Sequence, residues 1–223
     1  MSKSIVIFGK GPSVSRCSRE IIDKYDDIAI CNYPVLNDFF YNLIKDREIK
    51  YHFANCGTYD KRYNDETNKL LKIKGVYNCN YKSSILPYYN FLTDKKIFKE
   101  SIRETIEANL KKLNFDFDPS TGTLALYYII NTNIYNNILL VGFDNFKKGD
   151  QTYYFKPSEY NNKLNYLLKK NIIKSDGIFN IINCHDPDKT KIFYEYLFSN
   201  NSNINFKLIT NMDLKDFTNL EII

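Results

Sequence analysis

A short loop near the N-terminus, Gly9-Lys10-Gly11-Pro12-Ser13, has the residue types of an anion-binding turn. Two glycines let backbone N–H groups approach a phosphate closely, Lys10 adds a positive charge, and Ser13 adds a hydroxyl donor. The string matches neither G-x-x-x-x-G-K-[ST] nor G-x-G-x-x-G, so it indicates neither a P-loop nor a dinucleotide-binding fingerprint. A tight structural turn with two glycines is the alternative interpretation.

Three further turns carry groups suited to a nucleotide. Asn32 and Asn55 each follow a short apolar segment, and an amide at that place can both donate to and accept from a base or a ribose. Gly142-Phe143-Asp144 follows a third apolar segment. Because Asn also tolerates turn conformations, simple strand termination is the alternative for both amides.

Ser120-Thr121-Gly122 begins a helix-like segment directly after Pro119. The first N–H groups of a helix and the positive end of its dipole favour a bound phosphate or carboxylate. An ordinary N-cap by Ser120 is the alternative.

The chain has two histidines, and only one is placed for proton transfer. His52 lies in the apolar run Tyr51-His52-Phe53-Ala54, which is typical of a packed strand residue. His185 precedes Asp186, which can cap a helix. A helix N-terminus disfavours imidazolium, so His185 would stay neutral and able to accept a proton. A surface histidine at the start of a helix is the alternative.

Two D-x-D strings raise the question of a divalent cation: Asp116-Phe117-Asp118 and Asp186-Pro187-Asp188. Two carboxylates alone make a poor magnesium or manganese site without phosphates. Capping and dipole effects explain the second string. We therefore expect no metal cofactor. The chain also lacks a G-x-S-x-G elbow, which leaves an α/β-hydrolase unsupported.

The elements that must position these residues alternate between strand-like and helix-like segments. This alternation predicts an α/β fold with a mostly parallel sheet covered by helices. We expect strands at residues 4–8, Asp27–Cys31, 51–54, 75–79 and 137–141, and a final strand at Asn205–Ile209. We expect helices at residues 18–24, 36–46, 64–73, 95–113, 120–131 and 186–198. The four turns described above follow strands, so they should meet at the carboxyl edge of the sheet.

A polar, tyrosine-rich segment interrupts this alternation after residue 145. We interpret it as a small lid excursion that includes a helix at residues 158–170. The predicted organisation is a nucleotide-binding α/β domain at 1–145, a lid or acceptor-binding excursion at 146–184, and a return to the α/β domain at 185–223.

Composition limits the class of protein. The 223 residues include 19 Tyr and 16 Phe, ample material for a core. The net charge of +5 is scattered, so nucleic acid is not an expected partner, although a mild positive field suits an anionic donor or a membrane face. Five cysteines without a C-x-x-C pair indicate free thiols in a reducing cytosol. No apolar run is long enough to predict a transmembrane helix, so we expect a cytoplasmic location.

The order of these motifs resembles that of the bacterial sialyltransferases of glycosyltransferase family 42. The resemblance spans about residues 4 to 200 and rests on six elements that occur in the family's order. They are Ile7-Phe8-Gly9-Lys10-Gly11-Pro12-Ser13, Cys31-Asn32, Phe53-Ala54-Asn55, Ser120-Thr121-Gly122, Leu140-Val141-Gly142-Phe143-Asp144 and His185 before a helix.

This resemblance implies a Rossmann-like domain (a GT-A-like variant) with a lid, and inverting, metal-independent transfer of sialic acid from CMP-sialic acid to a glycan or glycolipid hydroxyl. The general base would be His185. The donor would be held by Gly9, Lys10, Gly11, Pro12, Ser13, Asn32, Asn55, Ser120, Thr121, Gly122, Gly142 and Asp144, with a lid hydroxyl from Tyr153 or Tyr154. A homotetramer is also implied.

The chain departs from the family pattern at three positions. Lys10 stands where the family usually has Asn, Phe146 where it has a lid tyrosine, and Asp118 where it often has an arginine. These departures leave two alternatives open. One is another nucleotide-dependent transferase on the same fold, which uses a UDP- or GDP-sugar or transfers pyrophosphate. The other is a non-catalytic relative that binds a nucleotide or glycan.

Overall fold

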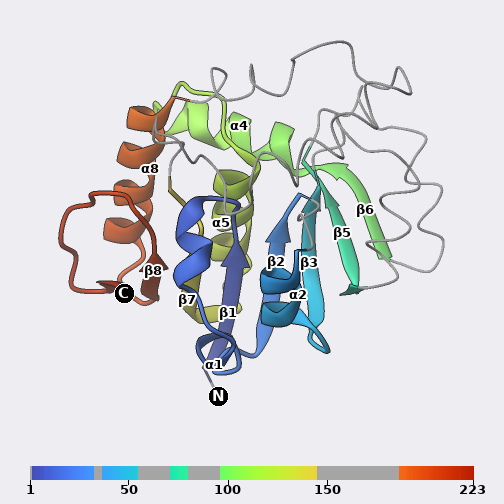
Figure 1. Ribbon diagram of the computed structural model, residues 1–223. Coiled ribbons are helices and arrows are strands. Elements are labelled where there is room, and N and C mark those ends of the chain that lie inside the picture. Colours follow the sequence, from blue (N-terminus) through green and yellow to red (C-terminus); the bar gives the residue numbers. More distant parts are fainter. Residues whose placement is uncertain (1, 33–36, 55–70, 80–95, 145–185) are drawn as a thin grey trace, which may run out of the picture.

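The computed structural model describes residues 2–32, 37–54, 71–79, 96–144 and 186–223, with only the backbone described at 96–99. These residues form one sheet of nine strands flanked by helices (Figure 1). The strands are β1 (Lys3–Phe8), β2 (Asp27–Cys31), β3 (Glu48–Ala54), β4 (Lys72–Ile73), β5 (Gly75–Asn78), β6 (Lys96–Ser101), β7 (Tyr135–Val141), β8 (Asn205–Ile209) and β9 (Leu220–Ile222).

The strand order is β6-β5-β3-β2-β1-β7-β8-β9, with β4 paired to β3 off this path. Every pairing in the described sheet is parallel. The parallel sheet predicted from the alternation of segments is therefore confirmed.

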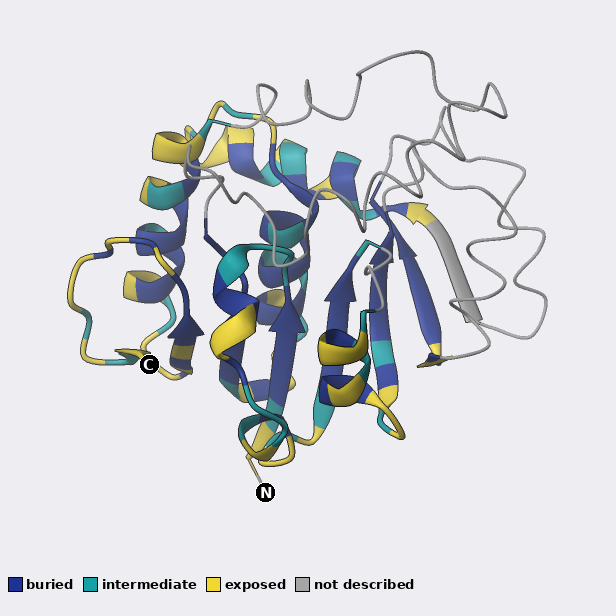
Figure 2. Ribbon diagram, viewed as in Figure 1, coloured by how far each residue is buried: buried dark blue, intermediate teal, exposed yellow. Residues whose placement is uncertain are grey.

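Helices cover both faces of the sheet, also as predicted. The described helical elements are η1 (Pro12–Arg16), α1 (Arg19–Ile22), α2 (Asp38–Ile44), α4 (Ile102–Lys112), α5 (Thr121–Asn131) and α8 (Pro187–Asn200). Ile5 and Ile7 of β1 pack in the cluster that includes α4, α5 and α8. Val6 and Phe8 pack in the cluster that includes α1 and α2. The alternation of side chains along a strand thus gives two cores, and the central strands are buried on both faces (Figure 2).

The direction in which the chain adds strands reverses at β1. From β1 it proceeds through β2 and β3 on one side, and later through β7 and β8 on the other. In register, Ile7 of β1 lies between Ala29 of β2 and Leu140 of β7. In open parallel sheets, such a switch point leaves a crevice beyond the carboxyl ends of the two neighbouring strands, and ligands bind there. The loop after β1 is therefore the place to look for a site.

The predicted helix at 95–113 differs most from the structure. Residues 96–101 form β6, which pairs with β5, and only Ile102–Lys112 are helical. The Ser101 side chain accepts the Glu104 N–H at 3.2 Å and so starts the helix there. Apolar residues spaced by three or four did not distinguish this strand from a first helical turn, because the run before Ser101 is short.

Smaller differences lie at other element ends. The predicted helix at 64–73 is wrong at its end, because Lys72–Ile73 form β4 against β3. β8 is not the final strand, since β9 pairs with it. α2 covers Asp38–Ile44 rather than 36–46 and begins after Asn37, whose side chain accepts the Phe40 N–H at 2.9 Å.

Several predictions lie outside the described residues. They include the lid excursion at 146–184 with its helix at 158–170, and residues 64–70 of the predicted helix at 64–73. Among the helices that the structure describes, none is both long and apolar enough to cross a membrane.

Candidate functional site

The loop after β1 is pinned along the end of β7. The Gly9 N–H donates to the Val141 carbonyl and the Gly11 N–H donates to the Gly142 carbonyl, both at 2.8 Å. Beyond them Pro12 lies in the first turn of η1. The loop thus crosses the switch point between β1 and β7, directly over the carboxyl edge of the sheet.

Two glycines make this close crossing sterically feasible. A Cβ on Gly11 would overlap the carboxylate of Asp144. Gly142 has a φ of +74°, and a Cβ there would collide with the side chain of Val14. Glycine at these positions is therefore required by backbone approach, and this requirement accounts for part of the motif independently of any ligand.

Asp144 and Ser13 tie the loop to the neighbouring strands. The buried Asp144 carboxylate accepts the Ser13 N–H at 2.8 Å and the Asn211 N–H at 2.6 Å. The Ser13 hydroxyl donates to the Ile209 carbonyl at 2.8 Å. The polar atoms of both side chains therefore bind backbone at the ends of β1 and β8. Any influence of these side chains on a ligand passes largely through the loop backbone that they fix.

Lys10 is a half-buried cation in this loop. Burial lowers the pKa of its ammonium to about 8, while the neighbouring Cys31 opposes that shift. Burial raises the pKa of the Cys31 thiol to about 12, and Lys10 opposes it. No described carboxylate forms an ion pair with Lys10. Burial destabilises the charged form of Lys10, so an anionic ligand in contact with the ammonium would stabilise that form.

The end of β2 and the start of α5 meet beside this loop. The Asn32 backbone adopts a left-handed φ of 57°, and its Nδ2 donates to Thr121 Oγ1 at 3.3 Å. The Cys31 thiol lies 4.0 Å from the Thr121 carbonyl oxygen. Three of the predicted motifs, the glycine loop, Cys31-Asn32 and Ser120-Thr121-Gly122, are therefore connected at one edge.

The start of α5 has the geometry of an anion-binding helix terminus. The buried Ser120 caps the helix, because its Oγ accepts the Thr123 N–H at 3.2 Å. Thr123 Oγ1 in turn lies 3.1 Å from the hydroxyl of Tyr194, which α8 contributes. The N–H groups of Thr121 and Gly122 precede the first intrahelical hydrogen bonds and carry the positive end of the dipole. The cap is thus observed, and it leaves the first two N–H groups of α5 for a ligand.

Four predicted site residues lie outside the described part of the chain: Asn55, Tyr153, Tyr154 and His185. Asp186, which follows His185, caps α8 by accepting the N–H groups of Asp188 and Lys189, each at 3.0 Å. The structure therefore shows the helix cap that the sequence predicted for Asp186-Pro187-Asp188. His52 is fully buried in β3, as predicted for a packed histidine.

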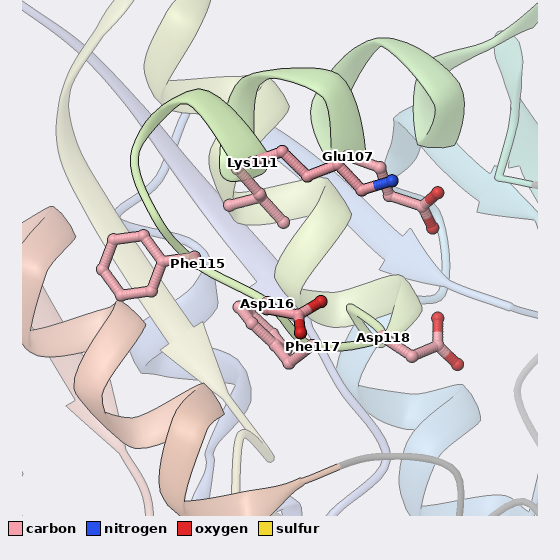
Figure 3. A pocket seen from close by; sticks show the side chains of 7 residues that line it. Glu107, Lys111, Phe115, Asp116, Phe117 and Asp118 are labelled. Carbon is pink, nitrogen blue, oxygen red and sulfur yellow. The ribbon is translucent and has the colours of Figure 1, made fainter.

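The first D-x-D string lines a surface pocket of about 230 Å³. Figure 3 shows Glu107 and Lys111 of α4 on one wall and the segment with Phe115, Asp116 and Asp118 on the other. Asp118 is ion-paired with Arg103. Within the described residues, no group of three or more His, Cys, Asp or Glu side chains is arranged to hold a metal ion.

Arg103, which lies beside the start of α5, was not among the residues predicted from the sequence. It is buried, and its guanidinium donates to the carbonyl of Pro119, just before the cap of α5. A signal was present in the sequence: Arg103, Ile106 and Leu110 follow one another at spacings of three and four, so a charge lies on the apolar face of α4. A buried arginine needs partners, and that requirement points to a structural junction.

Comparison with known proteins rests on structure alone, because no family model and no curated protein sequence matches the chain. A monofunctional alpha-2,3-sialyltransferase, Cst-I from Campylobacter jejuni, is similar with a TM-score of 0.60 at 23% identity, covering 97% of this chain and 83% of that one. The C. jejuni sialyltransferase CstII in complex with CMP-3FNeuAc gives 0.60 at 19% identity, covering 94% and 82%. CstII in complex with cytidine-5'-monophosphate gives 0.58 at 18% identity, covering 95% and 82%. The chain therefore shares its fold with these bacterial sialyltransferases, which confirms the fold that the motif order implied.

Proposed function

We propose that this protein is a glycosyltransferase that transfers sialic acid from CMP-sialic acid to a glycan or glycolipid hydroxyl. One observation carries the proposal. The glycine loop with Lys10, the Asn32 amide and the N-terminus of α5 converge at the carboxyl edge of a parallel sheet. The fold around them is shared with sialyltransferases that were crystallised with CMP or a CMP-sugar analogue.

In this proposal the donor lies across the switch point. Its anionic groups meet the N–H groups of Thr121 and Gly122 and the ammonium of Lys10. Asn32 and Asn55 recognise the nucleoside through their amides. Gly9, Gly11 and Pro12 present backbone along the donor, while Ser13, Gly142 and Asp144 hold that backbone in place. The hydroxyl of Tyr153 or Tyr154 approaches the phosphate from the lid.

The reaction is a displacement at the anomeric carbon of the donor sugar. The imidazole of His185 takes the proton of the acceptor hydroxyl as that oxygen bonds to the anomeric carbon. The bond from the anomeric carbon to the phosphate oxygen breaks, and CMP departs with the electron pair. Attack opposite the leaving group inverts the configuration. Position supports this role for His185, since it directly precedes the capped N-terminus of α8, which disfavours imidazolium.

We propose that groups of the protein itself, without a metal ion, stabilise the negative charge of the departing CMP. A monophosphate leaving group carries less charge than a diphosphate, and oriented N–H groups and a lysine can stabilise it. Lys10 and the first turn of α5 supply such groups on adjacent elements. We therefore propose a metal-independent reaction with no additional cofactor.

One observation favours a second candidate. Lys10 is a half-buried cation with no described carboxylate partner, and such a charge also suits a diphosphate, whose two negative charges lie next to each other. A UDP- or GDP-sugar transferase on the same fold would use it against the second phosphate. The test below separates the two candidates.

The deciding experiment is a thermal-shift and calorimetry panel with CMP, CMP-sialic acid, UDP, GDP and their sugars, each in EDTA and in manganese. A ligand that binds only the folded state raises its unfolding temperature by mass action. Stabilisation by the cytidine ligands in EDTA supports the proposal. Stabilisation by uridine or guanosine ligands alone, or only with manganese, contradicts it.

A turnover assay separates an enzyme from a protein that only binds. His185→Ala should retain CMP affinity and lose release of CMP from CMP-sialic acid in the presence of a glycan acceptor. His52→Phe is the matched control, because His52 is fully buried within β3. Wild-type protein that binds CMP-sialic acid without releasing CMP would support the non-catalytic alternative.

A further inference from the structure

Arg103, the second residue of α4, lies at the junction of three elements and is only 5% exposed. Its Nε donates to the carbonyl of Cys79, directly beyond β5, at 3.0 Å. Its Nη2 donates to the carbonyl of Pro119 at 3.0 Å, one residue before the cap of α5. One rigid guanidinium therefore joins the carboxyl end of a strand to the start of the helix that carries Thr121 and Gly122.

Two carboxylates compensate the charge of Arg103. Nη1 lies 3.0 Å from Glu107 Oε1, one turn further along α4, and 2.5 Å from Asp118 Oδ1. Burial lowers the pKa of the guanidinium, but Asp118 and Glu107 raise it and prevail, so Arg103 stays charged. Glu107 and Asp118 approach from opposite walls of the pocket in Figure 3. Lys111 and Asp116 are the other charged groups lining that pocket, and the Lys189 ammonium donates to the Asp116 carbonyl.

The placement of Asp118 matters for an anionic ligand. It lies two residues before Ser120, so its Cα is within about 7 Å of the cap residue of α5. A carboxylate without a counter-charge at that distance would oppose an anion bound to the first N–H groups of the helix. Within the described part of the chain, Arg103 pairs with Asp118 and supplies a counter-charge to it.

We propose that Arg103 is a positioning residue for the donor site: it orients the start of α5 through the Pro119 carbonyl and screens the Asp118 carboxylate from the anionic donor. The inference rests on the proposed function for the identity of that donor. Arg103 itself does not touch the donor and acts through Pro119 and Asp118. Its two bonds to backbone carbonyls distinguish it from a simple surface ion pair, since they fix the chain just beyond β5 and just before α5.

The test compares Arg103→Met, Asp118→Asn, the double variant and Glu107→Gln by calorimetry with CMP, at matched ionic strength. Arg103→Met should weaken CMP binding roughly tenfold, because it loses the orientation and removes a counter-charge from Asp118. Adding Asp118→Asn should recover about threefold of that loss, since it removes the opposing charge. Glu107→Gln keeps Arg103 and both carbonyl bonds, so it should bind within about twofold of wild type.

A purely structural role predicts a different pattern. In that case Asp118→Asn would bring no recovery, because it removes a further partner rather than a repulsive charge. Wild-type CMP affinity in Arg103→Met, or further weakening in the double variant, overturns the inference. Thermal unfolding of each variant identifies any that fails to fold. Arg103→Lys keeps the positive charge, so its affinity for CMP should lie between those of Arg103→Met and wild type.

A measurement without ligand separates this inference from the proposed function. Hydrogen exchange should increase in Arg103→Met at the hydrogen-bonded amides of Thr123 and Leu124, in the first turn of α5, more than in the last turn of the same helix. Glu107→Gln should leave those amides protected. If wild type fails to bind CMP, the proposed function fails, and exchange still decides whether Arg103 positions α5. Unchanged exchange at Thr123 and Leu124 in Arg103→Met overturns the positioning role.

Discussion

The ammonium of Lys10 should make donor binding depend on pH in a range where few other groups titrate. In the free protein burial lowers the pKa of Lys10 to about 8. An anionic donor in contact with the ammonium would raise that pKa again, because the charged form gains a partner. By linkage, affinity is then highest well below pH 8 and declines as the pH rises through the pKa of the free protein.

The size of the effect follows from that value. If the bound-state pKa is well above 9, the apparent Kd for CMP rises about tenfold from pH 7 to pH 9, or about 1.4 kcal/mol. Over the same range the thiol of the adjacent Cys31 does not ionise, since burial raises its pKa to about 12. The phosphate of CMP is already ionised above pH 7, so the slope reports on the protein.

Isothermal calorimetry at pH 7.0, 8.0 and 9.0 tests this with wild type, Lys10→Met and Lys10→Arg. Lys10→Met should bind CMP more weakly at pH 7 and show no slope, while Lys10→Arg keeps its charge and should also show none. The reasoning is refuted if wild type binds equally well at pH 7 and 9, or if Lys10→Met keeps the wild-type slope. The free protein gives a second check: relative to Lys10→Met, wild type should gain stability as the pH rises from about 8 towards 10.5, because the unfolded chain then binds a proton that folded Lys10 has lost.

Three further predictions concern the loop and the base. Gly142→Ala should destabilise the fold by about 2–3 kcal/mol, because alanine disfavours the positive φ and its Cβ would overlap Val14; a thermal melt should show a Tm lower by roughly 5–10 °C. Gly122→Ala is the milder control, because Gly122 is helical and its added Cβ would only contact Phe143 at 3.1 Å. Asp144→Asn should lower the free energy of unfolding by about 2 kcal/mol in denaturant and weaken CMP binding, because each carboxylate oxygen accepts one backbone N–H and the amide replaces one oxygen with a donor. Full CMP affinity would show that the loop holds without that carboxylate. His185→Ala should lower kcat by about 10²–10⁴ and leave the Kd for CMP unchanged, and an unchanged kcat would exclude it as the base.

The central part of the fold was predictable because local signals and burial agree there. β2 has the predicted bounds, and Ser120 and Asp186 cap the helices that were expected after them. Strands buried on both faces have continuous apolar runs, and capping side chains are local in sequence, so neither needs knowledge of distant contacts.

The edges of the sheet were not predictable in the same way. β4, β6 and β9 exist because they pair with β3, β5 and β8, and such pairing depends on segments distant in the sequence. β6 was read as part of a helix for this reason. Secondary structure at a sheet edge is decided by the neighbouring strand at least as much as by local propensity.

The candidate site shows the same division. The glycine loop, Asn32 and Ser120-Thr121-Gly122 were identified by residue type, and the structure connects them. The partners of Asp144 and Ser13 could not be read from the sequence, since they include backbone at Asn211 and Ile209 from the end of β8. The residue types indicated polar groups at a ligand site, whereas the structure shows that those two side chains hold the loop.

This distinction determines the charge that a ligand would meet at the switch point. Asp144 is a carboxylate near this edge, but it is 4% exposed and each of its oxygens already accepts a backbone N–H, so its oxygens are directed at the loop and not at a ligand. Asp118 is compensated by Arg103. Among the described groups at this edge, Lys10 and the N-terminus of α5 are positive and have no carboxylate partner. An anion bound there gains both interactions, and the affinities for CMP and for a nucleoside diphosphate, measured in EDTA with wild type and Lys10→Met, would show how many phosphates that positive edge accommodates. A loss on Lys10→Met confined to the diphosphate would favour the uridine or guanosine donor, and an equal loss for CMP would favour the cytidine donor.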